Sequence, residues 1–239
     1  MSFEFTKENI DQYLKEVAKE YRKRIGKAMP AEMVLIGGAS VLINYGFRGM
    51  TTDIDAIILA ASGMKDAIGA VGDKFNLPFG WLNTDFEKTD SYTPKLLEFS
   101  EYYRTFSNVL TIRTVRGECL IAMKLRSGRQ YKNDLSDVVG ILREHKNNGV
   151  PISLLDIKQA VTDLYGDWEQ LPPSSRSFIE QVMRYKEYDS LFAETIANEQ
   201  EAKNLLIKFD KDYPGAIKQS NVDRIIANLK DRTKDHPQL

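Results

Sequence analysis

Residues 33–40 read Met-Val-Leu-Ile-Gly-Gly-Ala-Ser, a short apolar run that ends in a pair of glycines. Such a run, followed directly by a glycine turn, is typical of a buried strand. The apolar pattern resumes over residues 39–45, which predicts a helix, and a second strand is expected at residues 52–59. A strand, a tight turn, a helix and another strand in this order predict an α/β fold, with a helix N-terminus beside the second strand.

The second predicted strand carries the motif Asp53-Ile54-Asp55. Residues i and i+2 of a strand point to the same face, so the two carboxylates project together. Their mutual repulsion is unfavourable unless a cation or hydrogen-bond donors compensate, and a ligand set of oxygens suits Mg²⁺ or Mn²⁺. Without further context, the same motif also fits a solvated strand end.

The glycine pair lies a helix-sized distance before this motif, since 53 − 38 = 15 positions separate Gly38 from Asp53. Backbone amides at a helix N-terminus can hold phosphate oxygens while the carboxylates hold the metal that bridges them. The combination therefore predicts a site for a metal-bound phosphate compound. The alternative is that Gly37 and Gly38 form only a tight turn.

The rest of the chain divides near Pro151. Before it, the patterns predict helices at residues 6–25, 64–75, 118–125 and from 134 onward, and strands at residues 81–86 and 109–115. After it, only helical segments are expected, starting near Ser153, Ser174 and Ser220. We therefore expect an α/β domain at residues 1–150 and a helical C-terminal domain at residues 151–239.

The composition is that of an ordinary soluble globular protein, with 42% hydrophobic and 28% charged residues among 239. The longest apolar runs fall well short of the roughly 20 residues that a bilayer requires, so no membrane association is expected. No basic and apolar leader opens the chain, which favours the cytoplasm. The net charge of −1 argues against a uniformly basic coat, and Cys119 with two histidines cannot assemble a Cys/His zinc site.

The glycine turn and the paired aspartates resemble the nucleotidyltransferase superfamily, in which a Gly-Gly or Gly-Ser turn precedes a strand with two aspartates. The closer resemblance is to the bacterial AbiE-type toxin nucleotidyltransferases and their uncharacterised relatives. It rests on residues 122–129, Ala-Met-Lys-Leu-Arg-Ser-Gly-Arg, and on the acidic helix start at residues 132–137. The resemblance covers roughly residues 33–142 and implies a nucleotidyltransferase fold, with a small mixed sheet flanked by helices.

The same resemblance implies an activity, the metal-dependent transfer of a nucleoside monophosphate from a nucleoside triphosphate to a hydroxyl of RNA, a protein or a small molecule. The toxin relatives suggest RNA or a protein as the acceptor, a role in a toxin–antitoxin system, and an antitoxin protein as a partner. The implied site residues are the metal ligands Asp53 and Asp55, the nucleotide ligands Gly37, Gly38, Ser40, Lys124 and Arg129, and a catalytic or lysine-positioning carboxylate, Asp134, with Asp137 as the second choice.

Lys124 can also be considered from its neighbours, because it is the only charge in residues 119–125. Its stem is expected to pack and its ammonium to face a fixed anion, either a phosphate or a nearby acid. A lysine that reaches solvent is the alternative, and Asp134 could serve only to favour the start of a helix. Residues 104–132 carry an excess of positive charge, with seven basic residues against one acid, Glu118, a balance of 7 − 1 = +6. Such a patch could receive a triphosphate or an RNA end, or it could form a solvated face. Its basic residues are Arg104, Arg113, Arg116, Lys124, Arg126, Arg129 and Lys132.

One departure from the superfamily pattern concerns a third carboxylate. Many nucleotidyltransferases carry it on a strand beside the first two, whereas residues 109–115, Val-Leu-Thr-Ile-Arg-Thr-Val, contain none. Asp85, Glu98 or Asp137 could take its place. The missing acid keeps open a second interpretation, a non-catalytic nucleotide- or protein-binding module. A phosphatase that uses Asp53 as its nucleophile fits less well, because the apolar run of the strand follows the aspartates and does not lead into them. A dinucleotide-binding oxidoreductase also fits less well, because the G-x-G-x-x-G spacing is absent.

Overall fold

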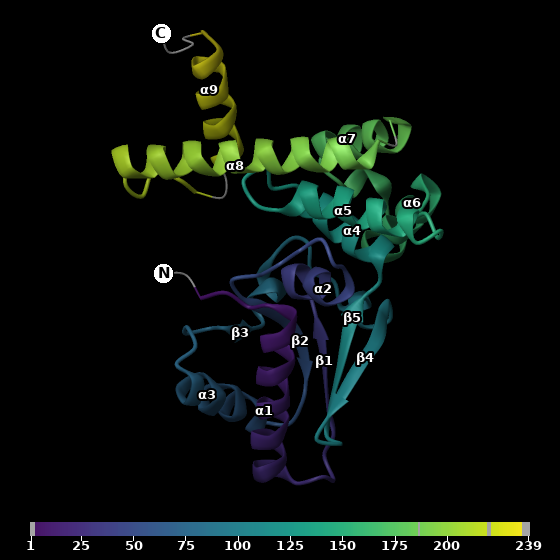
Figure 1. Cartoon of the computed structure of the whole chain (residues 1–239), viewed down its shortest axis with the longest axis vertical. Coiled ribbons are helices and arrows are strands. Elements are labelled where there is room, and N and C mark those ends of the chain that lie inside the picture. Colours follow the sequence, from purple (N-terminus) through teal and green to yellow (C-terminus); the bar gives the residue numbers. More distant parts are fainter. Residues whose placement is uncertain (1–2, 186, 219–220, 236–239) are drawn as a thin grey trace.

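A five-stranded sheet forms the lower half of the molecule in Figure 1, with the strand order β3-β2-β1-β5-β4. The computed structural model describes residues 3–185, 187–218 and 221–235. The sheet is mixed, because β1 runs parallel to β5 and antiparallel to β2, β3 is parallel to β2, and β4 is antiparallel to β5. The strands are β1 (Ala31–Leu35), β2 (Ile54–Leu59), β3 (Leu82–Asn83), β4 (Ser100–Phe106) and β5 (Leu110–Val115).

Two helices, α1 (Lys7–Ile25) and α3 (Gly63–Phe75), pack on one face of the sheet. Thr6 caps α1, as the sequence predicted. The apolar stripe of α1 is fully buried and shares a hydrophobic cluster with Met33 of β1 and Ile112 of β5. This packing fixes the long axis of α1 along the sheet, from the end near the glycine turn to the opposite end.

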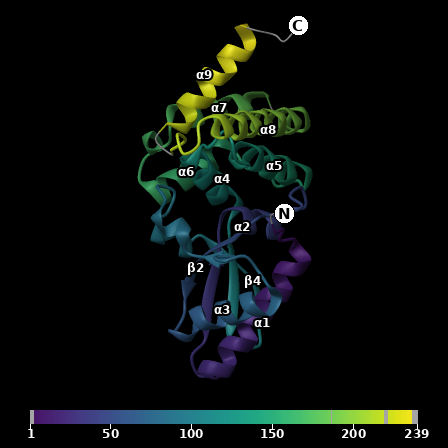
Figure 2. The same cartoon turned by 90° about the vertical axis from the view of Figure 1, so that its left-hand side faces the viewer.

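The upper half of the molecule is helical, and α9 extends from its top in both views (Figures 1 and 2). One hydrophobic cluster joins Val34 and Ile57 of the sheet to Leu120 of α4 and Ile179 of α7. The core therefore continues across residue 150. The helices not yet named are α2 (Gly37–Asn44), α4 (Gly117–Ser127), α5 (Asp134–Asn147), α6 (Leu154–Tyr165), α7 (Pro173–Tyr185), α8 (Tyr188–Asp212) and α9 (Val222–Asp235), with 3₁₀ turns at Asp85–Lys88, Pro94–Leu97 and Trp168–Gln170.

The expected fold class, a small mixed sheet flanked by helices with helices alone after it, is confirmed. The strand expected at residues 81–86 is wrong in extent, since β3 has two residues and a 3₁₀ turn follows it. The strand β4 was not predicted, and α8 was not distinguished from the helix that precedes it, α7. The helix start expected near Ser220 lies outside the described residues. No helix within the described ranges combines the length and the hydropathy of a membrane span.

Candidate functional site

The glycine turn joins β1 to α2 and lies against the start of β2. The amide of Ile36 donates to the carbonyl of Asp55 at 2.9 Å, and Gly37 has a φ of +53°, the left-handed region that side chains adopt at a cost of about 1–2 kcal/mol. A Cβ on Gly38 would lie 2.7 Å from the hydroxyl of Thr51 and 3.0 Å from the guanidinium of Arg48. Both glycines are therefore required by the local backbone and its neighbours.

The N-terminus of α2 opens beside this turn without a side-chain cap. Ile36 occupies the cap position and makes no capping hydrogen bond, and the first turn of α2 contains no acidic residue. The first N–H groups of a helix have no partner within the helix and carry partial positive charge. This helix end can therefore receive the oxygens of an anion.

Asp53 and Asp55 lie at the start of β2, next to the turn. Asp53 is exposed and Asp55 is partly buried, and a Cβ on Gly37 would lie 3.9 Å from a carboxylate oxygen of Asp55. Burial and the charge of Asp53 raise the pKa of Asp55 to about 6, against the opposing effects of Lys132, Arg129 and Asn83. The raised pKa reflects the burial of Asp55 first and the neighbouring charge of Asp53 second, which Lys132, Arg129 and Asn83 offset only in part.

This pair of carboxylates suits a divalent cation. Neither forms an ion pair with any residue that the structure describes. In the same ranges no cluster of three or more His, Cys, Asp or Glu residues could hold a metal. Mg²⁺ commonly binds through one or two carboxylates together with substrate phosphates and water. Two aspartates beside an open helix N-terminus match the number of carboxylates that such a site takes from the protein.

Asn83 was missed by the sequence prediction. It pairs in register with Asp55 on the neighbouring parallel strand β3, and its side chain lowers the pKa of Asp55 by hydrogen bonding. The available signal was its position two residues after Trp81, inside the strand expected at residues 81–86. Of the proposed third carboxylates, Asp85 is exposed and pairs with Lys88 at 2.6 Å, and Glu98 is exposed at the end of a 3₁₀ turn.

The side chain of Ser40 lies inside the protein, beneath the glycine turn, and does not reach the molecular surface. It is fully buried, and its Oγ accepts a hydrogen bond from the amide of Val115 at 3.1 Å. The hydroxyl thus ties α2 to the end of β5. The structure does not bring it to the surface with the carboxylates, although the sequence pattern grouped it with the nucleotide ligands.

Lys124 and four other charged residues form a second cluster, which we call the buried ion cluster: Arg48, Lys124, Arg129, Asp134 and Asp137. The ammonium of Lys124 lies 3.0 Å from Asp134 and 2.8 Å from Asp137. Arg129 contacts Asp134 at 2.7 Å, and Arg48 contacts Asp137 at 2.5 Å. Three cations therefore neutralise two carboxylates.

Charge pairing holds this cluster in its ionised form. Burial alone would raise the pKa of Asp134, but Lys124 and Arg129 outweigh it and hold that pKa well below its usual range. Burial would likewise lower the pKa of Lys124, and the charges of Asp137 and Asp134 reverse the effect and raise it. The sequence left open whether the ammonium of Lys124 faces a phosphate or a nearby acid. In the structure it faces two acids, Asp134 and Asp137.

The buried ion cluster lies close to the glycine turn and to the carboxylates without a direct contact to either aspartate among the described residues. The guanidinium of Arg48 lies behind Gly38, and the charges of Arg129 and Asp55 interact. A role for Arg48 was missed, because nothing in the sequence connects it to a carboxylate 89 positions away. The basic residues of positions 104–132 do not all remain unpaired. Arg104 forms an ion pair with Asp11, and Arg116 forms one with Glu101.

A hollow of about 280 Å³ lies beside the buried ion cluster and extends to α8. Arg48 and Asp137 contribute to its wall, and the remaining lining combines apolar and polar side chains. Its apolar and aromatic members are Phe47, Met50, Tyr131, Phe192 and Ile196. Residues 47–50 and the two neighbours of Lys132, Tyr131 and Asn133, thus line a space that reaches α8.

A mixed sheet with a glycine turn at a helix N-terminus and two carboxylates on the next strand defines a protein of the nucleotidyltransferase type. A family model described as a nucleotidyltransferase of unknown function (DUF6036) matches residues 12–170, and the chain belongs to this family. The matched range contains both clusters and crosses residue 150. No curated protein and no solved structure matches the chain. The AbiE-type resemblance stays a prediction.

Proposed function

We propose that this protein is a metal-dependent nucleotidyltransferase that transfers a nucleoside monophosphate from a nucleoside triphosphate to a hydroxyl. In the reaction, a bond forms between the acceptor oxygen and the α-phosphorus. The bond from that phosphorus to the bridging oxygen breaks, pyrophosphate leaves, and the hydroxyl proton passes to solvent. The observation that carries the proposal is the juxtaposition of the Gly37 turn with the partly compensated carboxylates of Asp53 and Asp55.

Each part of the site has a role in this proposal. Asp53 and Asp55 would hold the divalent ion, which when bound stabilises negative charge on the phosphate oxygens. The uncapped N-terminus of α2 would orient the triphosphate. Gly37 and Gly38, which have no side chains, would allow the phosphates to approach the backbone. Arg129 and Lys132, whose charges reach Asp55, would offset charge on the leaving group.

Lys124 would act as a positioning residue. Its ammonium is engaged by Asp134 and Asp137, so its effect on the nucleotide would pass through Arg129, which shares Asp134 with it. The acceptor would bind in the hollow that Arg48 and Asp137 share with α8. An RNA or protein acceptor, and a toxin paired with an antitoxin protein, belong to this proposal through the AbiE-type resemblance.

The test is to incubate the full chain with each α-labelled nucleoside triphosphate, Mg²⁺ or Mn²⁺, and cell RNA or lysate, and to follow the label. Transfer to an acceptor is expected for the wild type and for Asp66→Asn, an exposed carboxylate on α3, and not for Asp53→Asn. Metal-dependent nucleotide binding without transfer would favour the non-catalytic module instead. If the chain neither bound nor transferred any nucleotide, the proposal would be wrong.

A further inference from the structure

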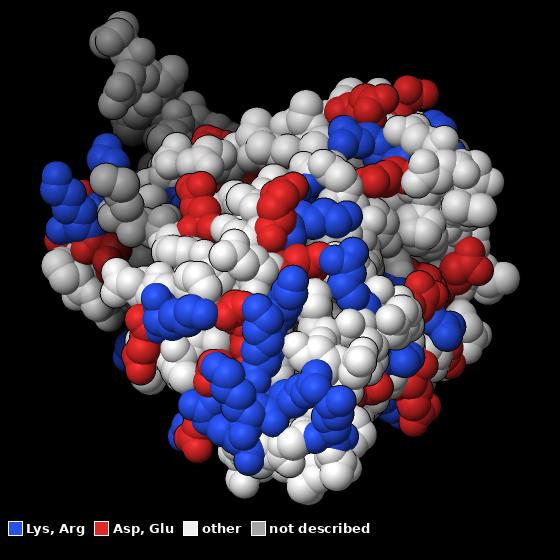
Figure 3. Space-filling model, turned by 60° about the horizontal axis from the view of Figure 1, so that its bottom comes forward, with Lys and Arg blue, Asp and Glu red and all other residues white. Residues whose placement is uncertain are grey.

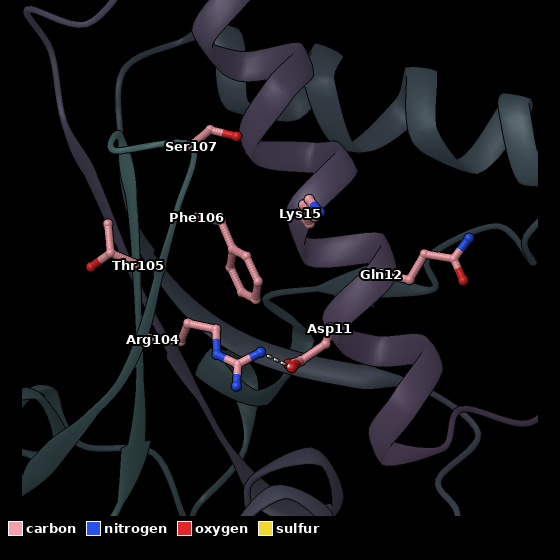
Figure 4. Close-up of a pocket in the computed structure, with 7 residues that line it drawn as sticks. All are labelled: Asp11, Gln12, Lys15, Arg104, Thr105, Phe106 and Ser107. Carbon is pink, nitrogen blue, oxygen red and sulfur yellow. Dashed lines mark hydrogen bonds and ion pairs between the residues drawn. The ribbon is translucent and has the colours of Figure 1, made fainter.

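The charged groups on the α1 side of the molecule are mostly engaged with one another. A hollow of about 470 Å³ lies there between α1 and β4. Figure 4 shows the guanidinium of Arg104 directed at Asp11 of α1, and the two are 2.6 Å apart. Lys and Arg side chains gather where this end of the molecule comes forward in Figure 3, and lysines of α1 pair there with Glu16 and Glu20. The acids and the arginine of this side are therefore already paired.

The hollow that Arg48 and Asp137 share with α8 contains a carboxylate of a different kind. Glu199 of α8 lines this hollow, and only 5% of the residue is exposed. Among the described residues it forms no ion pair, although Lys203 follows it by four positions on the same helix. Burial raises the pKa of Glu199 to about 7, and the charge of Asp137 raises it further. This buried acid therefore has no cation of the protein as its partner.

One oxygen of Glu199 is fixed, and the other is left for a ligand. Its Oε1 accepts hydrogen bonds from the amides of Leu135 at 2.8 Å and Ser136 at 3.2 Å. No described backbone amide donates to Oε2, and the side chain of Ser136, which also lines the hollow, lies close to the carboxylate. An ionised carboxylate oxygen only accepts hydrogen bonds. A ligand in this hollow therefore meets a fixed acceptor and must bring a donor.

The charge balance of the hollow favours a neutral donor. Arg48 and Lys203 bring two positive charges, and Asp137 and Glu199 bring two negative ones, a balance of 2 − 2 = 0. Asp137 is moreover held by Arg48 and Lys124. A cationic ligand, such as a lysine side chain of a partner protein, therefore finds no net attraction here.

The other walls of the hollow are aromatic. Phe47, Tyr131 and Phe192 are half-buried and line it. The rings of Phe47 and Phe192 meet edge to face, with their centres 5.5 Å apart. At about 280 Å³ the hollow is at the small end of ligand pockets, which commonly measure about 300–1,000 Å³, so it takes one ring system and not a folded segment. A flat compound with a neutral N–H group fits both the walls and the carboxylate.

We propose that this hollow binds a nucleobase with an exocyclic amine, adenine or cytosine, and that Glu199 selects it by accepting a hydrogen bond from that amine. Hypoxanthine and uracil carry a carbonyl oxygen at the same position, which would face the carboxylate oxygen with no hydrogen between them. That the ligand is a nucleobase rests on the proposed function, through Arg48, which lines the hollow and lies against Gly38 of the glycine turn. The acceptor site proposed in this hollow makes the end of an RNA acceptor the first source of the base, and the triphosphate is the second.

The experiment measures the affinities of paired ligands that differ in this one group. It is carried out at about pH 8, above the pKa of Glu199, where the carboxylate is ionised. One arm compares ATP with ITP and CTP with UTP in the presence of Mg²⁺. The other arm compares dinucleoside monophosphates that end in the same four bases, without triphosphate or metal. In the arm that supplies the base, the wild type should prefer the amine in each pair by about tenfold.

Glu199→Gln should invert this preference. Its carbonyl oxygen must accept the amides of Leu135 and Ser136, so its NH₂ group faces the hollow as a donor. The variant should therefore favour the carbonyl base of each pair by about tenfold. Glu201→Gln, an exposed residue of the same helix with the same change of charge, should behave like the wild type.

Two outcomes would overturn the inference. One is equal affinity within each pair in both arms, a result that the wild type gives even if Glu199→Gln folds poorly. The other is a preference that the folded variant Glu199→Gln leaves unchanged, which would assign the selection to another residue. The expected preference without transfer of label would refute the transferase only, whereas transfer of label without any preference would refute the role of Glu199 only.

Discussion

Two pairs of aspartates lie near each other in this molecule and differ in their surroundings. Asp134 and Asp137 are buried, and Lys124, Arg48 and Arg129 neutralise them. Asp53 and Asp55 form no ion pair with a described residue, and the pKa of Asp55 is raised to about 6 by burial and by Asp53. The comparison teaches that the same side chain can be fully paired in one place and left without an ion pair in another, depending on which cations the fold places beside it.

The largest effect is expected from Asp53→Asn/Asp55→Asn, which removes the two carboxylates proposed to bind the metal. Transferase turnover should fall at least about a hundredfold, the scale of losing a preorganised electrostatic contact. Uptake of Mg²⁺ or Mn²⁺ in the presence of nucleotide, measured by titration calorimetry, should disappear. The free energy of unfolding should stay equal or rise, because the substitution relieves repulsion. Metal uptake equal to that of Asp66→Asn would contradict the assignment.

The next effect concerns the neutralised pair and is expected in stability. From the sequence alone, Lys124→Met should fold normally, since methionine keeps much of the stem volume. The ion pairs reverse that expectation, because the substitution leaves Asp134 and Asp137 short of a cation, at a cost of about 3–5 kcal/mol. Urea unfolding measures the loss. Lys208→Met, at an exposed position of α8, is the control and should change stability by less than about 0.5 kcal/mol. A loss for Lys124→Met as small as this would show that the buried charge balance is unimportant.

A third prediction separates the glycine turn from ordinary helical glycines. Gly37→Ala should lower the free energy of unfolding by about 1–2 kcal/mol, because its φ of +53° is unfavourable for alanine. Gly69→Ala in α3, where a Cβ meets nothing within 4 Å, should instead raise stability by about 0.5–1 kcal/mol. Thermal or urea unfolding of both variants gives the comparison. Equal signs for the two substitutions would argue against a strained turn.

The smallest effect concerns Glu199 of α8, which accepts hydrogen bonds from the amides of Leu135 at 2.8 Å and Ser136 at 3.2 Å. Burial raises the pKa of Glu199 from its ordinary value of 4.5 to about 7. The folded protein therefore binds more protons than the unfolded chain between these values, so stability should decrease as pH rises from about 4.5 to about 7.

Glu199→Gln should remove this part of the pH dependence, which is on the order of 1 kcal/mol. Unfolding free energies measured at several pH values for wild type and variant provide the test. Parallel pH profiles would mean that Glu199 titrates alike in the folded and unfolded states. The matched control is Glu201→Gln, an exposed residue of the same helix.

The sequence predicted those parts of the fold that depend on neighbouring residues. The glycine turn, the paired aspartates and the apolar stripe of α1 are local patterns, and their elements were found. β4 escaped because side chains such as Glu101, Tyr102 and Arg104 are exposed on this edge strand, so no apolar alternation marks it. α8 escaped because no proline or glycine separates it from α7.

The parts of the site that depend on distant contacts could not be obtained in this way. A lone lysine in an apolar helix indicated a fixed anion but not which one, and Asp134 lies ten positions away across a break between helices. The pairing of Arg48 with Asp137 joins segments that only the completed fold brings together. The burial of Ser40 likewise depends on where β5 ends beside α2.

The contact between Glu199 and the start of α5 has a consequence for how α8 can change in length among relatives that share this helix. A residue inserted in α8 before Glu199 would turn its carboxylate by about 100° around the helix axis, away from the amides of Leu135 and Ser136. Insertions and deletions between Tyr188 and Glu199 should therefore be rare among relatives. Beyond Glu199 the same helix is free of that constraint, and length variation should begin there.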